Sequence, residues 1–217
     1  QCQPAQCLVE LQAAQAALPA KLIQQQPVLN AYRQLLTFPF WQSPVRGMHT
    51  KPVALSPLIE MQQLYLLDVW LKIQSGEPAT IKAMLQQDLR FWRQWLVTSN
   101  NPFDKSLAVS GMSRHFMFAK MFQQTLPAEQ FQQFIPDLWR QPLTADELSL
   151  RLAMAGEWHF ANSAIQSIRQ ERPQQQSRLE QWFMPLLWQP FLKPQAVSNT
   201  FARMHLACAD QTSAVDS

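Results

Sequence analysis

The chain has 217 residues, of which 47% are hydrophobic and only 15% are charged, and its formal net charge is +3. This balance excludes disorder driven by excess charge, and the 18 Lys and Arg residues form no run typical of a nucleic-acid or lipid-headgroup surface. Glutamine makes up about one residue in seven, while valine, isoleucine and threonine are scarce. Because glutamine is a good helix former, the composition predicts an all-α fold.

Prolines and helix-capping residues divide the first half of the chain into predicted helices, since proline starts or ends a helix. These helices span residues 8–18, 28–36, 57–74 and 79–97. The last two are separated by a short turn at 75–78, so they must lie antiparallel. Residues 38–57 contain several prolines and no sustained period, which predicts a long loop, a kind of segment that is often functional.

Capping signals continue in the second half, with Asn101 before Pro102 and a capping box at Thr144 and Glu147. The predicted helices span 102–123, 127–134, 145–168, a segment after a second capping box at 177–180, and 196–209. No repeat near 34 residues is present. We therefore predict a single domain over 1–217, with N-terminal segment 1–7 and flexible tail 210–217, as an irregular bundle or solenoid-like array of about eight antiparallel helices.

The chain has no pattern that predicts catalysis or a resident cofactor. Its four histidines lack the spacing of helical zinc ligands, and no G-x-S-x-G, P-loop or G-x-G-x-x-G motif occurs. We predict no metal, no cofactor and no catalytic residue. Scattered carboxylates such as Asp68, Asp88 and Glu157 leave a hydrolase as the third hypothesis, because paired acids meet in space rather than in sequence.

Charged residues inside the most apolar helices predict buried ion pairs, since an unpaired buried charge costs several kcal/mol. Asp68 lies in LYLLDVWL, and two arginines, Arg90 and Arg93, lie in DLRFWRQWL on the antiparallel partner. We predict that Asp68 and Arg90 form a buried pair that specifies the fold. A weaker second polar cluster is predicted from Arg114, His115 and Glu157.

Aromatic residues open the long loop at Phe38, Phe40 and Trp41. An exposed aromatic and proline patch of this kind can mark a partner surface. The alternative is that these side chains plug the helical bundle, and ordinary burial preferences favour the plug.

Two cysteines stand at the start of the chain, in QCQPAQC, and Cys208 lies near its end. A small looped disulfide between Cys2 and Cys7 ranks first, although Cys208 could pair with either one if the termini meet. Such a bridge suits an oxidising compartment outside the cytoplasm. No stretch approaches the ~18 apolar residues needed to span a bilayer. Because the chain begins at Gln1, we expect that a signal or membrane anchor has been removed.

Longer stretches of the chain resemble a known family. These stretches are CLVELQAAQAALPAKLIQQQPVLNAYRQLL, DLRFWRQWLVTSNNPFDKSLAVSGMSRHF, MAGEWHFANSAI and FLKPQAVSNTFARM. They are similar to uncharacterised proteobacterial proteins that carry one N-terminal transmembrane helix and an α-helical periplasmic region. The resemblance implies an envelope location, periplasmic and anchored to the inner membrane in the precursor, and it implies no reaction.

The leading hypothesis is a non-catalytic envelope protein that docks an unknown protein or peptide partner, because helix pairs present grooves suited to helices or extended peptides. The alternative is a carrier or sensor of an apolar small molecule held in a cavity between helices. A closed apolar cavity would favour the carrier, and an exposed apolar surface would favour docking.

Overall fold

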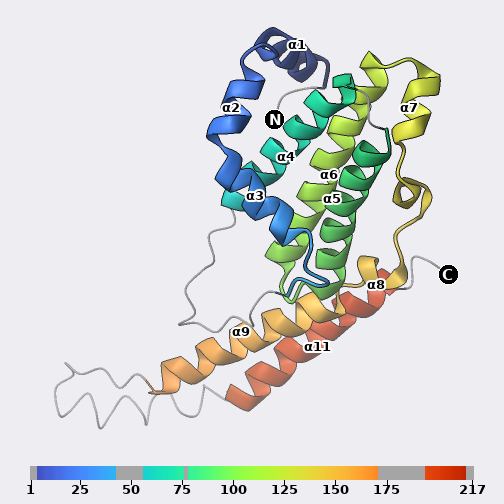
Figure 1. Cartoon of the computed structure of the whole chain (residues 1–217). Helices are drawn as coiled ribbons and strands as arrows, with labels where there is room; N and C mark the ends of the chain where they lie inside the picture. Colours follow the sequence, from blue (N-terminus) through green and yellow to red (C-terminus); the bar gives the residue numbers. More distant parts are fainter. Residues whose placement is uncertain (1–3, 43–55, 76–77, 171–193, 214–217) are drawn as a thin grey trace. The chain divides into compact units, whose positions relative to one another are not determined.

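The computed structural model describes residues 4–42, 56–75, 78–170 and 194–213, and these ranges form helices and no strand (Figure 1). The predicted all-α fold is confirmed. The helices are α1 (Pro4–Ala14), α2 (Leu18–Gln24), α3 (Gln26–Leu35), α4 (Ser56–Ser75), α5 (Pro78–Thr98), α6 (Pro102–Thr125), α7 (Ala128–Phe134), η1, a short 3-10 helix (Asp137–Arg140), α8 (Ala145–Leu148), α9 (Arg151–Gln170) and α11 (Pro194–Ser213).

Several helix boundaries differ from the sequence prediction. The first helix begins at Pro4 rather than at residue 8. Between the two helices predicted over 8–18 and 28–36, the chain forms a further helix, α2, with Pro19 in its first turn. Proline is tolerated there because the first-turn N–H groups have no partner within the helix. The helix predicted over 145–168 is two helices, because α8 ends at Leu148 and α9 begins at Arg151. The capping box predicted at 177–180 lies outside the described residues.

By packing, the chain divides into two compact units. Unit 1 comprises Gln1–Trp41, Val53–Thr98 and Ser106–Glu147. Unit 2 comprises Gln42–Pro52, Ser99–Lys105 and Leu148–Ser217. Each unit consists of three separate ranges of the chain, so the division describes how residues pack and does not divide the sequence into two consecutive domains. The single domain stays a prediction.

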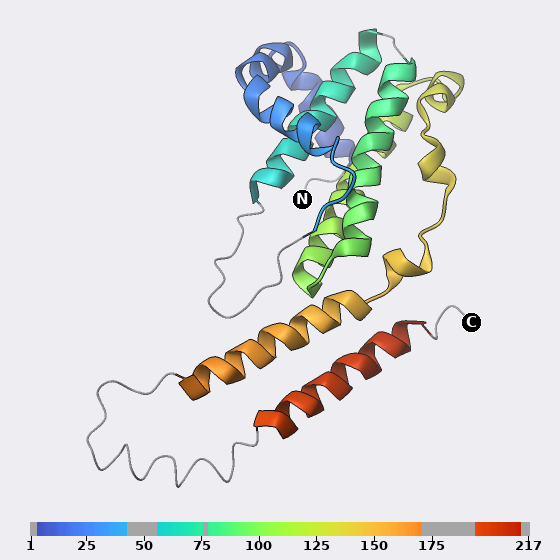
Figure 2. The same ribbon diagram turned by 60° about the horizontal axis from the view of Figure 1, so that its bottom comes forward.

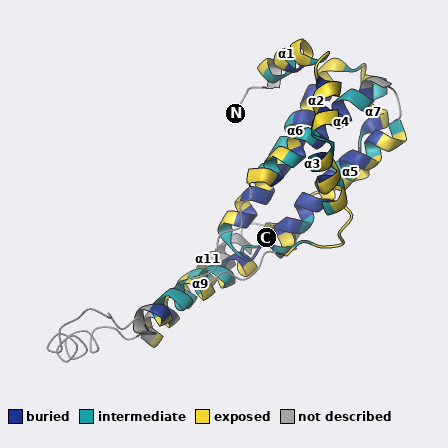
Figure 3. Cartoon of the chain, turned by 60° about the vertical axis from the view of Figure 1, so that its left-hand side comes forward, coloured by how far each residue is buried: buried dark blue, intermediate teal, exposed yellow. Residues whose placement is uncertain are grey.

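Unit 1 has an aromatic core between α3, α4, α5 and α6. The largest side chains that are almost completely buried there are Trp92, Trp95, Tyr32, Tyr65 and Phe122. Figure 3 shows the buried residues running along α4, α5 and α6. A Cβ at Gly111 on α6 would lie 2.1 Å from the Trp92 ring, so only glycine lets α6 approach α5 this closely.

Unit 2 is built on α9 and α11, which lie side by side and antiparallel (Figures 1 and 2). A Cβ at Gly156 on α9 would lie 1.6 Å from the carbonyl oxygen of Asn100, so glycine here admits the backbone of the segment 99–105. Lys105 ties the same segment to the start of α9 by donating to the Ser149 carbonyl at 2.5 Å. None of the described helices is long and apolar enough to cross a bilayer.

Candidate functional site

Asp88 on α5 is completely buried, and four side chains surround its carboxylate. Oδ1 accepts hydrogen bonds from the Tyr32 hydroxyl at 2.6 Å and the Trp92 indole at 3.3 Å. Oδ2 accepts from the Gln62 amide at 3.1 Å and lies 2.8 Å from His115 Nδ1. Donors therefore face both oxygens, which is the arrangement that an ionised carboxylate requires in the absence of water.

The proton on His115 is located by its second ring nitrogen. The Trp139 indole N–H, which can only donate, lies 2.8 Å from His115 Nε2. Nε2 must accept, so the ring proton sits on Nδ1 and is donated to Asp88. Because both nitrogens are engaged and His115 is completely buried, the ring has no nitrogen left to exchange a proton with a bound substrate.

Gln62 on α4 extends this cluster to α6. Its amide nitrogen also donates to the Gly111 carbonyl at 2.9 Å, and its Oε1 accepts from Arg114 at 2.7 Å. Burial lowers the pKa of Arg114, although Tyr32 and Asp88 oppose this change. Arginine stays charged at neutral pH despite such a shift. The Arg114 cation is therefore linked to the Asp88 carboxylate through the Gln62 side chain.

The tyrosines of this region act as fixed donors. Burial raises the pKa of Tyr32 well above its ordinary value, and the charge of Asp88 adds to the effect. Burial also raises the pKa of Tyr65, whose hydroxyl donates to the Met84 carbonyl at 3.2 Å. Both phenols therefore remain protonated at neutral pH. We name the Asp88 network for the residues that these contacts join: Tyr32, Gln62, Asp88, Trp92, Arg114, His115 and Trp139.

The Asp88 network joins α3, α4, α5, α6 and η1 at one buried point. Its polar groups are satisfied by one another, a condition under which buried polar residues specify one packing arrangement of the helices. Opening the network to a substrate would leave several buried donors without acceptors. The geometry therefore favours a structural role over acid–base chemistry.

Arg93 forms a second buried cluster in unit 1. Its guanidinium contacts both carboxylate oxygens of Glu147, with Nε to Oε1 at 2.5 Å and Nη2 to Oε2 at 2.7 Å. The same group donates to the carbonyls of Leu138, Gln141 and Pro142. Arg93 thereby fixes the chain from η1 to α8 against α5.

Glu147 also completes the predicted capping box with Thr144. The Thr144 amide donates to Glu147 Oε2 at 2.6 Å, and the Glu147 amide donates to Thr144 Oγ1 at 3.3 Å. Burial tends to raise the pKa of Glu147, but the hydrogen bonds from Arg93 and Thr144 outweigh it, so the pKa is lowered. The capping box is confirmed, and its Glu147 carboxylate also forms an ion pair with the buried Arg93.

The predicted pair between Asp68 and Arg90 is wrong. Asp68 Oδ2 instead contacts Arg33 on α3 at 2.7 Å and Lys72, one turn along α4, at 2.8 Å. Arg90 is exposed. The reason is helical phase, since Arg90 lies two residues after Asp88 and therefore about 200° around α5 from its buried face.

The predicted cluster of Arg114, His115 and Glu157 has two members in unit 1 and one in unit 2, so the contact of Glu157 with the other two stays a prediction. Arg114 and His115 both belong to the Asp88 network of unit 1. Glu157 lies on α9 of unit 2. Neighbouring positions in the α6 sequence therefore revealed two members of the network, but not Asp88 at its centre.

Of the predicted partner surface, Phe38 and Phe40 are exposed and Trp41 is half-buried. Trp41 is half-buried and packs edge-on against Phe91 and Trp95, with ring centroids 6.1 Å and 5.6 Å away. Its carbonyl accepts a hydrogen bond from Thr98. Phe38 and Phe40 are 54% and 66% exposed. Trp41 is therefore a plug, and two exposed rings remain of the predicted patch.

Cys7 lies on α1 and packs against the core of unit 1. Cys2 lies outside the described residues, so its predicted disulfide with Cys7 stays a prediction. Within the described ranges, no three His, Cys, Asp or Glu side chains gather closely enough to hold a metal ion.

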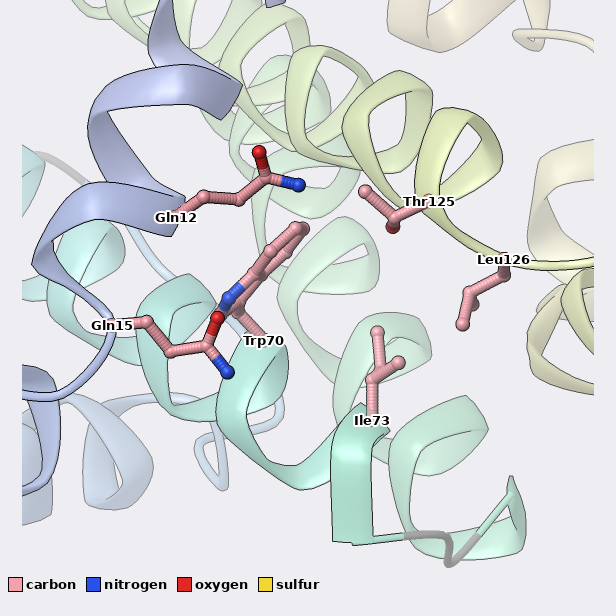
Figure 4. Close-up of a pocket in the computed structure, with 6 residues that line it drawn as sticks. All are labelled: Gln12, Gln15, Trp70, Ile73, Thr125 and Leu126. Carbon is pink, nitrogen blue, oxygen red and sulfur yellow. The ribbon is translucent and has the colours of Figure 1, made fainter.

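A pocket of about 200 Å³ lies between α1, α4 and the end of α6 in unit 1 (Figure 4). Its lining residues are Gln12, Gln15, Trp70, Ile73, Thr125 and Leu126. The Trp70 indole N–H is buried and has no hydrogen-bond partner. Leaving such a donor unsatisfied costs about 1–3 kcal/mol. No sequence pattern singles out Trp70.

The surface of unit 2 has an unusual distribution of apolar side chains. The buried residues described on α9 and α11 are small, namely Ala153, Ser167 and Ser198. Five large apolar side chains of the same helices are exposed, namely Leu152, Phe160, Phe201, Met204 and Leu206, whereas Met154, Trp158 and Ile165 on α9 are half-buried. We call these five residues the hairpin surface, although Leu206 lies about 200° around α11 from Met204 and therefore faces another side of the helix. A two-helix contact ordinarily buries most of its large apolar side chains, so five exposed ones on this pair of helices are unusual.

Comparison with known proteins gives no relative. No protein-family model matches the chain, and neither a curated protein nor a solved structure is significantly similar to it.

Proposed function

We propose that the protein is a non-catalytic docking protein of the cell envelope, and that the hairpin surface on α9 and α11 binds an apolar helical segment of a partner protein. The observation that carries this proposal is the exposure of large apolar side chains beside small buried ones. Met204 is 60% exposed and Phe201 is 40% exposed. Clusters of exposed large apolar residues are typical of interaction sites.

The shape and charge of the hairpin suit a helix. The two antiparallel helices have 20 residues each and are therefore about 30 Å long, a length along which the side chains of a third helix can pack. Phe201 and Met204 are three residues apart and therefore lie on the same face of α11. The two helices contain few charged residues, so an apolar rather than an ionic partner surface fits best.

A partner helix fits the hairpin surface better than a second copy of the chain does. Each of the five side chains offers roughly half of the ~200 Å² that a large side chain can bury, so all five together would offer at most about 500 Å². A stable dimer interface needs about 800 Å² from each subunit. The exposed pair Phe38 and Phe40 is smaller still, which favours the hairpin over the loop as the docking site.

The envelope location rests on the family resemblance of the sequence and on the predicted disulfide between Cys2 and Cys7. Alkylation of the unreduced protein in denaturant should therefore find one free thiol, that of Cys208. Three free thiols would overturn the predicted bridge and remove one of the two supports for the location.

The docking proposal is tested by a photo-reactive amino acid placed at Met204 in the full-length protein within native envelopes. Asn199, an exposed polar residue on the same helix, is the matched control position. We expect position 204 to cross-link reproducibly to one apolar helical segment of one protein, identified by mass spectrometry. The additional change Phe201→Asp should abolish this product.

Three outcomes contradict the docking proposal. They are cross-links of equal yield from positions 199 and 204, cross-links only to a second copy of the chain, and a product that persists with Phe201→Asp. Circular dichroism of the Phe201→Asp protein serves as the folding control, because an exposed substitution should leave the helix content unchanged.

A further inference from the structure

We infer that the pocket beside Trp70 in unit 1 is a binding site for a small, neutral, mostly apolar molecule that carries a carbonyl or ether oxygen. This site is independent of the proposed docking function, because the hairpin surface belongs to unit 2. It gives the sequence-based alternative, a carrier or sensor of an apolar ligand, a definite location and ligand chemistry.

The first support is an indole donor without an acceptor. Trp70 is 3% exposed, and its Nε1 is buried with no hydrogen-bond partner. Indole N–H can only donate, so no change of protonation can satisfy it and it needs an acceptor from another group. In Figure 4 the indole nitrogen lies on the side of the pocket where Gln15 stands. A ligand oxygen that displaces the neighbouring Gln15 side chain would supply the missing acceptor.

The second support is the rigidity of the wall behind this donor. The Trp70 ring stacks on Phe122, with centroids 5.6 Å apart and an interplanar angle of 27°. Phe122 in turn packs against Phe118 at 6.3 Å. Because these rings fix the indole, the direction of its N–H is set before any ligand arrives, which reduces the ordering cost of binding.

The lining of the pocket defines the ligand class. Trp70, Ile73 and Leu126 supply apolar contact, and the remaining side chains of the lining are polar but uncharged. A charged ligand would find no counter-ion there, so the lining favours a neutral molecule. The volume of about 200 Å³ is below the ~300–1,000 Å³ of pockets for drug-sized ligands, so the molecule must be small.

The inference is tested with two probes of similar shape, cyclohexanone and methylcyclohexane, on the intact protein. We expect cyclohexanone to bind about tenfold more tightly, because only the ketone accepts the indole hydrogen bond. Binding should also move the ¹H–¹⁵N signal of the Trp70 indole, which is assigned by its disappearance in Trp70→Phe.

Two variants separate the donor from the pocket. Trp70→Phe retains an aromatic wall and should lose the preference for the ketone, while Ile73→Trp fills the pocket and should block both probes. Equal binding of the two probes to the wild-type protein, no binding of either, or an unchanged ketone preference in Trp70→Phe would overturn the inference. If Trp70→Phe fails to fold, Ile73→Trp and the wild-type probe comparison still decide the outcome.

Discussion

The two units treat large apolar side chains in opposite ways. Unit 1 buries Trp92, Trp95, Tyr32 and Tyr65 in a core whose Asp88 carboxylate accepts hydrogen bonds from four side chains. On the helices of unit 2, the buried described residues are alanine and serine, and several phenylalanine, methionine and leucine side chains are exposed. Burial of apolar area is the main source of folding free energy. Unit 1 therefore has the contacts of a stable core, and unit 2 leaves several large apolar side chains exposed.

This difference bears on function as well as on stability. A surface that docks a partner must stay exposed until the partner arrives, and the region that carries it is drawn from the less stable part of a protein. A buried polar network, in contrast, fixes one arrangement of helices and suits the part that must not move.

The largest effect that tests this contrast is expected from Asp88→Ala. The change removes the acceptor of four buried donors in unit 1 and should lower the free energy of unfolding by about 5 kcal/mol. For a chain of this length, the melting temperature should fall by roughly 10–15 °C, measured by calorimetry. Glu60→Ala, an exposed acid on α4, is the control and should change it by no more than about 1 °C. Equal melting temperatures for the two variants would show that the network does not stabilise unit 1.

A matched pair of phenylalanines compares the two units directly. Phe122 in unit 1 is 1% exposed, and Phe201 in unit 2 is 40% exposed. Phe122→Ala should cost about 3–4 kcal/mol because it leaves a cavity in the core. Phe201→Ala should cost less than about 1 kcal/mol, because its ring lies on the surface. Both values come from urea denaturation, and a cost for Phe201→Ala that equals the cost for Phe122→Ala would break the contrast.

The sequence predicted the helices well and the buried contacts poorly, for a physical reason. Helical period, proline and capping residues act over a few neighbouring positions, so the start of α6 at Pro102 and the capping box at Thr144 could be read directly. Which charged side chains meet depends on helical phase and on how helices cross. The predicted pair of Asp68 and Arg90 is wrong because Arg90 faces away from the buried side of α5. The actual partner, Arg33, lies on α3.

A signal for the Asp88 network was nevertheless present in the sequence. Asp88 falls on the apolar stripe of α5, four residues after Met84 and four before Trp92, where only a satisfied polar residue is tolerated. Gln62 holds the equivalent place on α4, where it is completely buried. The exposed hairpin surface had no such signal, because a helical period cannot tell which apolar face lacks a partner.

The pair of Arg93 and Glu147 gives a smaller effect that depends on pH. Glu147→Gln retains a capping side chain but removes the charge, and should cost about 2 kcal/mol at pH 7. Because the folded-state pKa of Glu147 is lowered, its contribution is complete above the unfolded pKa of about 4.3 and is lost as the pH falls through the lowered folded value. The difference in stability between wild type and variant should therefore stay constant from about pH 7 to 5 and shrink below about pH 4.

Urea denaturation at each pH measures this difference, and Glu129→Gln, at an exposed position on α7, is the control. A difference that grew as the pH fell would mean that the folded protein does not favour the ionised form of Glu147. A constant difference at every pH would assign the cost to packing rather than to charge.

The smallest effect is expected from Asp137→Asn, which tests whether burial, rather than the ion pair itself, makes the contacts of unit 1 stabilising. Asp137 lies 2.8 Å from Lys82, but its side chain is 71% exposed. The hydrogen bond and charge of Lys82 lower the pKa of Asp137. Because water and salt screen such a pair, the melting temperature should change by no more than about 1 °C. An NMR titration of the Asp137 carboxyl should show the pKa returning toward its ordinary value in 1 M salt. A larger fall in melting temperature would mean that exposed charges also stabilise unit 1. The buried core of unit 1 would then not be the whole difference in stability between the two units.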